Sequence, residues 1–150
     1  MPACIIPVGP EFKDPEGFGN SPPEILSPDP AFGATTTATP TTPKTFSITV
    51  FDLNADDFLS VRWFVDGMLG PETKHMPSLA MPHAAPQEIG CQQSMDLNLN
   101  QHLVKAAVAD RDFDNSNPND KLAIKDPVFG KVTQITWTLN LTCPMGTPSP

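Results

Sequence analysis

Short segments in which apolar and polar residues alternate constrain the fold of this chain more than any other feature. The clearest is 135–143, in which every second residue is apolar and each residue between is Thr or Asn. The same period of two recurs at 46–50, 59–66, 97–100 and 104–108. Side chains alternate across a β-strand, so each segment predicts a strand with one buried face. We therefore predict an all-β sandwich in which Trp63 and Trp137 share one interior.

The segments between these strands carry the signals of turns rather than of helices. Asp66-Gly67 predicts a tight hairpin turn leading to Met68 and Leu69. No ten-residue segment has a helical apolar stripe flanked by caps, so at most one helical turn is expected, at 78–85 or 118–125.

Proline divides the chain into a tether and a domain. Ten of the 19 prolines lie in residues 1–44. Proline-rich chain is extended and semi-rigid, so we predict a tether at 1–22, a sandwich domain at 23–143 and a disordered tail at 144–150. Composition leaves two interpretations for the Thr- and Pro-rich stretch 35–43. It is either an irregular edge strand with its turn, which we favour, or a glycosylated stalk.

The charge and the first cysteine bear on partners and compartment. A net charge of −8 with scattered Lys and Arg leaves no basic patch, which argues against nucleic acid as a partner. No run of about 18 apolar residues is present to span a bilayer. Cys4 follows the small residue Ala3, as the lipid-bearing cysteine of a bacterial lipoprotein does. We therefore expect an exported protein of the periplasm, outer membrane or cell surface, attached by lipid at Cys4. The alternative is a chance cysteine in a mobile tail.

Two cysteines then remain as an even pair. An even pair in an exported domain predicts a disulfide between Cys91 and Cys143. The alternative is two buried free thiols. Cys143 ends the last strand, whereas Cys91 precedes a strand expected to start at the other end of the domain. The bridge therefore requires the chain after Cys91 to cross the sandwich.

A family resemblance rests on four segments, which are Asn20–Ile25, Phe46–Gly67, His102–Asp110 and Val132–Thr142. They resemble the bacterial immunoglobulin-like and polycystic-kidney-disease-type (PKD) repeats found in surface or periplasmic lipoproteins of Gram-negative bacteria, and the resemblance covers roughly 20–142. It implies an immunoglobulin-like antiparallel β-sandwich of about seven strands and suggests an adhesive role. The chain departs from the pattern in having no Tyr, no cadherin-type calcium linker and no glycine-rich aromatic motif in the penultimate strand.

Two acidic loops are the main candidates for a site. The first contains Asp52, Asn54, Asp56 and Asp57, and the second contains Asp110, Asp112, Asp114, Asn115, Asn117, Asn119 and Asp120. In an immunoglobulin topology these loops lie at the same end of the sandwich. Calcium takes six to eight oxygen ligands, so Asp52, Asn54, Asp56, Asp110, Asp112 and Asp114 form a candidate calcium site. The alternative is ordinary hydrated turns, in which Asp and Asn are common.

Other chemistry is more weakly indicated. Soft ligands for copper gather in one segment, at His75, Met76, Met81, His83, Cys91 and Met95. The alternative is a proline-rich crossover loop. None of the three histidines lies in a recognisable catalytic context. Arg62 and Asp66 suggest a surface ion pair. Phe64 is expected on the outer side of its sheet, as either an exposed contact or a residue covered by a loop. A polar ladder on the outward face of the last strand is predicted at Thr136, Thr138 and Asn140.

These observations predict a non-catalytic binding or structural accessory module of an exported (lipo)protein. Its ligand surface is expected at loops 52–57 and 110–120, because loops on a rigid scaffold commonly bind. The partner would be a protein or a glycan. The alternatives are a calcium-dependent adhesion module and, more remotely, a small metal-handling protein or hydrolase.

Overall fold

A computed structural model describes residues 20–54, 58–75, 83–91, 100–116, 119–127 and 130–143, without the side chains of residues 75 and 83. In these ranges the chain forms eight strands and no helix, so the predicted all-β class is confirmed. The strands are β1 (Glu24–Ile25), β2 (Thr35–Thr37), β3 (Lys44–Phe51), β4 (Leu59–Val65), β5 (Met68–His75), β6 (His83–Ile89), β7 (Gln101–Ala109) and β8 (Val132–Asn140). A search of the same ranges finds no helix long and apolar enough to cross a membrane.

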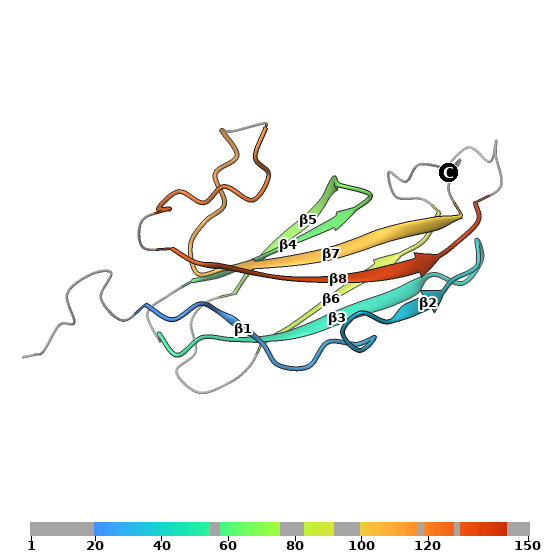
Figure 1. Ribbon diagram of the computed structural model, residues 1–150, viewed down its shortest axis with the longest axis horizontal. Coiled ribbons are helices and arrows are strands. Elements are labelled where there is room, and N and C mark those ends of the chain that lie inside the picture. Colours follow the sequence, from blue (N-terminus) through green and yellow to red (C-terminus); the bar gives the residue numbers. More distant parts are fainter. Residues whose placement is uncertain are drawn as a thin grey trace, which may run out of the picture.

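The strands form two packed sheets (Figure 1). One sheet has the order β1-β3-β6 and the other has the order β2-β8-β7-β4-β5. The neighbours β4, β7 and β8 correspond to the C, F and G strands of an immunoglobulin domain, so the predicted immunoglobulin-like sandwich is confirmed. One pairing differs from a purely antiparallel sandwich, because β2 runs parallel to β8. The chain reaches β2 by crossing over from β1 rather than by a hairpin from β8, so its direction is not reversed.

The Thr- and Pro-rich stretch 35–43 forms an edge strand and its turn. β2 lies at the edge of the five-stranded sheet, and Thr39 and Thr42 exchange backbone hydrogen bonds in the turn that follows. This is the favoured interpretation of the sequence, and no stalk is needed to explain the stretch. Proline around an edge strand is expected, because a strand edge tolerates a residue without an N–H.

The interior is built around the two tryptophans, as the alternation predicts. Trp63 and Trp137 are stacked with their ring centroids 5.8 Å apart, and Phe46 packs against Trp137 at 5.3 Å. All three side chains are buried. The Trp137 indole N–H donates to the backbone carbonyl of Pro30 at 2.6 Å. This bond satisfies the one polar group of the Trp137 side chain. Both tryptophans belong to the buried core between the sheets.

The sequence interpretation was wrong for residues 83–89. We expected a proline-rich loop or a helical turn here, but these residues form β6, which pairs with β3 along its whole length. Pro86 lies within this strand, and β6 can accept it because it is an edge strand. The other position considered for a helical turn, 118–125, has no helix in its described part, 119–125. The expected alternation at 97–100 falls mostly outside the described residues.

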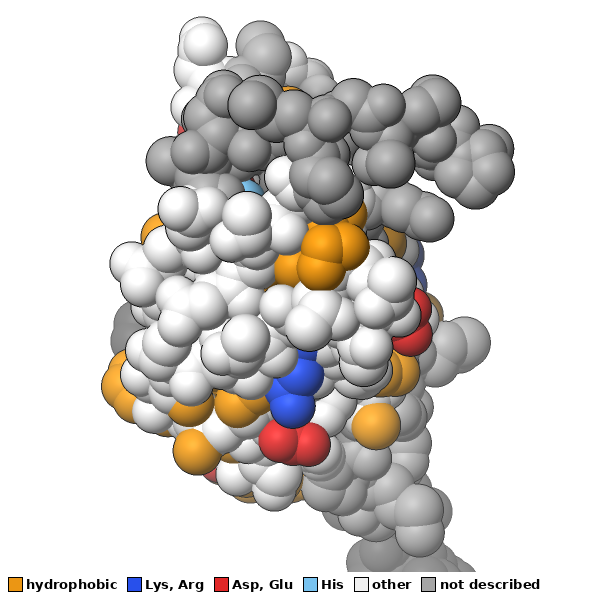
Figure 2. Space-filling model, turned by 90° about the vertical axis from the view of Figure 1, so that its right-hand side faces the viewer, with side chains coloured by type: hydrophobic (Ala, Val, Ile, Leu, Met, Phe, Trp, Pro, Cys, Tyr) orange, Lys and Arg blue, Asp and Glu red, His pale blue; other side chains and the backbone are white. Residues whose placement is uncertain are grey.

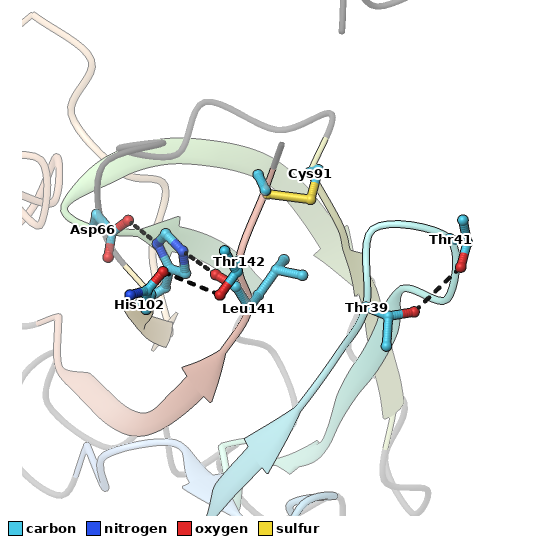
Figure 3. Close-up of a disulfide and its surroundings, with 9 residues drawn as sticks. Thr39, Thr41, Asp66, Cys91, His102, Leu141 and Thr142 are labelled. Carbon is cyan, nitrogen blue, oxygen red and sulfur yellow. Dashed lines mark hydrogen bonds and ion pairs between the residues drawn. A yellow bond between two sulfur atoms is a disulfide. The ribbon is translucent and has the colours of Figure 1, made fainter. Parts of the chain in front are cut away.

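β6 removes the difficulty posed by the predicted disulfide. It carries the chain away from the acidic loops, because Ile89 is paired with Lys44 at the start of β3. Cys91 therefore lies at the same end as Cys143, and the two form a disulfide with Cα atoms 5.5 Å apart (Figure 3). The predicted bridge is confirmed and the alternative of free thiols is wrong. The bond links the three-stranded sheet to the five-stranded sheet at one end of the domain.

Candidate binding surface

The described residues between β7 and β8, which are 110–116, 119–127 and 130–131, fold back over the outer face of the five-stranded sheet, and we call them the outer loop. In Figure 1 they rise above the sheet at the upper left. Every residue of β4 is buried, on the outer face as well as the inner one. Phe64, Ala107, Ala109, Phe113 and Ile124 form a second small core beneath the outer loop. Phe64 is therefore not an exposed contact, and the alternative of cover by a loop is confirmed.

Arg62 fastens the outer loop to the sheet. Its guanidinium is 2% exposed and pairs with Glu72 on β5, with Nη2 2.5 Å and Nε 3.1 Å from one carboxylate oxygen. It also donates to the Lys121 carbonyl at 2.7 Å and to the Asn115 side chain at 2.6 Å. Its Cζ lies 4.2 Å from the centroid of the Phe113 ring. The expected surface pair with Asp66 is wrong, because the loop that buries Arg62 could not be placed from the sequence.

A surface ion cluster holds the outer loop to β5 near its base. Asp112 accepts from Lys74 at 2.5 Å and from Lys125 at 3.0 Å. The hydrogen bond from Lys74, followed by that from Lys125, lowers the pKa of Asp112, and the bond to Asp112 raises the pKa of Lys74. The pKa of Asp114 is lowered by hydrogen bonds from the Ser116 hydroxyl and backbone. These carboxylates are thus charged and engaged with the protein's own donors.

The two acidic loops lie at one end of the sandwich, and residues 20 and 21 connect them. The Asn20 side chain donates to Asp110 at 2.7 Å, and the Ser21 backbone N–H donates to the Asn54 side-chain oxygen at 3.0 Å. Asp110 is buried and also accepts from the Lys131 backbone. The last residues of the predicted tether are therefore hydrogen-bonded to the domain. The convergence of the loops follows from the topology, but this connection left no signal in the sequence.

The predicted metal ligands that the structure describes do not form one group. Asp52 and Asn54 share a turn, in which the Asn54 N–H donates to Asp52 at 2.7 Å. Within the described ranges, no three His, Cys, Asp or Glu side chains are grouped so that they could hold a metal ion. Asp56 lies outside those ranges, so the calcium site stays a prediction.

The predicted copper ligands and the predicted lipid-bearing cysteine lie mostly outside the described residues. Of the copper candidates, Cys91 is in the disulfide. The side chains of His75, Met76, Met81, His83 and Met95 lie outside the description, as does the predicted lipid-bearing Cys4.

The third histidine is a buried structural group. His102 is 1% exposed, with Nδ1 2.7 Å from an Asp66 carboxylate oxygen and Nε2 3.0 Å from the Leu141 carbonyl (Figure 3). Asp66 begins the predicted hairpin turn, and its φ of 50° beside 75° at Gly67 is the left-handed conformation that such a turn requires. With both ring nitrogens bonded and no exposure, this imidazole is not available to a substrate in solution.

The outer loop covers only part of the sheet and leaves a hollow at its edge. The hollow has a volume of about 270 Å³ and lies between the loop, the β4–β5 turn and the start of β7. We call it the outer hollow, and it is lined by Phe64, Gly67, Leu103, Lys105, Asn119, Asp120, Lys121 and Leu122. Leu69 pairs with Phe64 across the sheet, and both Leu69 and Leu103 are about half exposed. The sequence predicted the loop region 110–120 but gave no sign of this apolar floor.

Two lysines stand at the outer hollow. Lys105 Nζ is 6.0 Å from the centroid of the Phe64 ring. Lys121 Nζ donates to the Gly67 carbonyl at 2.7 Å, which ties the outer loop to the β4–β5 turn. The one carboxylate in the lining, Asp120, accepts from the Leu122 N–H at 3.0 Å. The Lys121–Gly67 bond thus holds the loop wall of the hollow to the sheet, whereas the Asp120–Leu122 bond is local to the loop.

The opposite end of the sandwich has a different character. Figure 2 looks at the end that lies to the right in Figure 1, where β2 and β8 finish. Most of its visible surface is uncharged polar side chains and backbone, and hydrophobic groups are dispersed. The visible part of this end therefore offers no concentration of charge comparable to that of the acidic loops.

Comparisons with known proteins give a fold neighbour and no family. No protein-family model matches the chain, and no curated protein does either. Among solved structures, the chain is similar to the CARDB domain of the PF1109 protein from Pyrococcus furiosus, crystallised in complex with di-metal ions. The two share 12% identity over 82% of this chain and 93% of that one, with a TM-score of 0.45.

Proposed function

We propose that this chain is a non-catalytic binding module of an exported protein, with its ligand surface on the outer loop. The observation that carries the proposal is the outer hollow, an apolar recess with a few polar groups at its rim, which is the usual composition of a binding site. Its walls are fixed by the buried Arg62 and by the Lys121–Gly67 hydrogen bond. A preformed surface of this kind loses little conformational entropy when it binds.

Export is supported by the disulfide, because such bonds persist in oxidising compartments and are rare in the cytosol. Attachment to a membrane through lipid at Cys4 is part of the proposal, as is a place in the periplasm or on the cell surface. The resemblance to domains of Gram-negative lipoproteins points the same way. The acidic loop 52–57 precedes the start of β4, whereas the hollow lies at the other end of that strand, next to Phe64 and Gly67.

A fragment screen tests the site without knowledge of the ligand. A library of small aromatic and aliphatic fragments is added to the ¹⁵N-labelled chain, and amide shifts are mapped by NMR. We expect the shifts to gather at Gly67, Leu103 and Leu122. Leu103→Asp should abolish them, whereas Leu26→Asp is a matched control because Leu26 is 48% exposed and Leu103 is 49% exposed. Fragments that bind elsewhere, or nowhere, would contradict the proposal.

Thermal melts separate the calcium-dependent alternative. Melts with excess CaCl₂ and with EDTA should coincide if the domain binds no calcium. A bound ion would raise the midpoint, since a ligand at 100 times its Kd adds about 2.7 kcal/mol to stability. A higher midpoint in calcium, lost in Asp52→Asn, would favour the adhesion module instead.

A further inference from the structure

We infer that the outer hollow receives a large apolar side chain that is flanked by acidic residues on an extended segment of a partner protein. This inference rests on the proposed function and names the chemistry of its ligand. It comes from three features of the hollow, which are its size, its apolar floor and the charge of its rim.

Size limits what the hollow can take. The hollow has a volume of about 270 Å³ and is open to solvent, which places it at the small end of the range of about 300–1,000 Å³ that is usual for small-molecule sites. It has room for one bulky side chain. Protein interfaces commonly insert such an anchor into a small pocket near their centre, and the anchor carries much of the binding energy. The floor of Phe64, Leu103 and Leu122 is apolar and so favours an aromatic or aliphatic anchor.

Charge selects among partners with such an anchor. The chain carries −8 overall, yet two lysines and only one carboxylate line the hollow. Asp120 is already engaged with the Leu122 N–H, and Lys121 uses one of its three donors on Gly67. Lys105 and Lys121 can therefore each meet a carboxylate beside the anchor. Opposite charges at the rim of an interface speed association and disfavour basic partners.

The uncovered sheet face next to the hollow gives an extended segment room to lie. Leu103 pairs with Thr138, and Lys105 pairs with Thr136, on the side of β7 away from β4. Thr138 in turn pairs with Thr35 on β2. Thr136 and Thr138 belong to the predicted polar ladder, which carries no charge. A segment anchored in the hollow would cross this ladder.

Three capped heptapeptides serve as probes. The first is Glu-Asp-Glu-Phe-Glu-Asp-Glu, the second replaces every acidic residue by Lys, and the third replaces Phe by Ser. Each is titrated into the ¹⁵N-labelled full chain. We expect only the first to shift the amides of Gly67, Leu103, Lys105 and Leu122 in a saturable way. Addition of 0.5 M NaCl should weaken it, because surface charges are then screened beyond a few ångströms.

Charge variants give the decisive comparison. K105Q with K121Q should weaken the first peptide by about tenfold, since two exposed pairs together contribute on the order of 1.4 kcal/mol. K44Q is the control, because it removes one lysine charge from β3 in the other sheet, and it should leave binding unchanged. If the lysine peptide binds as well as the acidic one, the inferred partner chemistry is wrong while the proposed site survives. If the fragments shift these amides and no peptide does, the inferred partner is wrong and the proposed binding site stands.

Discussion

At the scale of single residues, Arg62 has the largest structural effect outside the main core. One guanidinium connects β5, through Glu72, to two points on the outer loop, Asn115 and Lys121. A buried charge of this kind is tolerated only when its hydrogen bonds are made. The sequence shows Arg62 as an outward residue of a strand, and outward residues are usually solvated. Arg62 becomes a buried side chain that joins the sheet to the loop only when the outer loop has folded over it.

Replacing Arg62 by Met should lower the free energy of unfolding by about 3 kcal/mol, near the lower end for a broken buried pair, because the partner Glu72 is partly exposed. Urea denaturation followed by tryptophan fluorescence measures the change. Lys44→Met, an exchange that breaks none of these bonds, should change stability by well under 1 kcal/mol. A loss for Arg62→Met no larger than that of the control would contradict the assigned role.

Asp112→Asn should destabilise the protein slightly at neutral pH and not at all in strong acid. The pKa of Asp112 is lowered from its ordinary value of 3.8. Its contribution is therefore complete above 3.8 and is lost as the pH falls through the lower folded value. Denaturant midpoints of both proteins between pH 2 and 8 should differ above pH 4 and converge at the acid end. A constant difference at every pH would mean that charge pairing with Lys74 and Lys125 is not the cause. The effect stays small because the cluster is exposed to solvent.

At the scale of the elements, the longer edge strands both contain a proline. β5 carries Pro71 and β6 carries Pro86, while Pro40 and Pro43 follow the short edge strand β2. An edge strand presents unpaired backbone groups that can join another chain, and proline interrupts that row. The same prolines hid β6 from the sequence interpretation, because proline in a segment is evidence against a strand. Proline argues against a central strand but is tolerated in an edge strand, which is the position of both β5 and β6.

The double variant P71V/P86V should stay folded but associate more readily. Each substitution restores a backbone N–H on an open edge and raises strand propensity. Light scattering during mild heating, at equal protein concentration, should rise several-fold faster than for the unaltered chain. Pro22→Val, at an exposed residue outside the strands, is the control and should behave like the parent. Equal scattering of the double variant and the control would show that these edges are protected in another way.

At the scale of the whole molecule, the two ends of the sandwich are held by different means. The disulfide links the two sheets at one end, where Cys91 and Cys143 follow β6 and β8. At the other end, hydrogen bonds from Asn20 and Ser21 connect the acidic loops. The β4–β5 turn and the outer loop bound the hollow between these ends. The main core, with Trp63 against Trp137, lies between the sheets.

Removing the bridge with C91S/C143S should lower the free energy of unfolding by about 4 kcal/mol, because the closed loop spans 52 residues and its loss frees the unfolded chain. Urea denaturation should show the same loss when the unaltered protein is reduced. Cys4→Ser keeps the bridge and should leave the midpoint unchanged. A large effect of Cys4→Ser would mean that Cys4 takes part in the folded domain's disulfide chemistry.

The sequence by itself determined the class of fold and the inward-facing residues of the alternating strands. Those depend on local periodicity, which a short segment carries within itself. The pairing of Cys91 with Cys143 was one of two alternatives that the sequence offered, and the tertiary structure decided between them. Tertiary structure alone decided the path of β6, the parallel partner of β8, the burial of Arg62 and Phe64, and the outer hollow. Each of these arises where segments distant in the chain meet. A loop of mixed polar and apolar residues contains no period that says which face of which sheet it will cover.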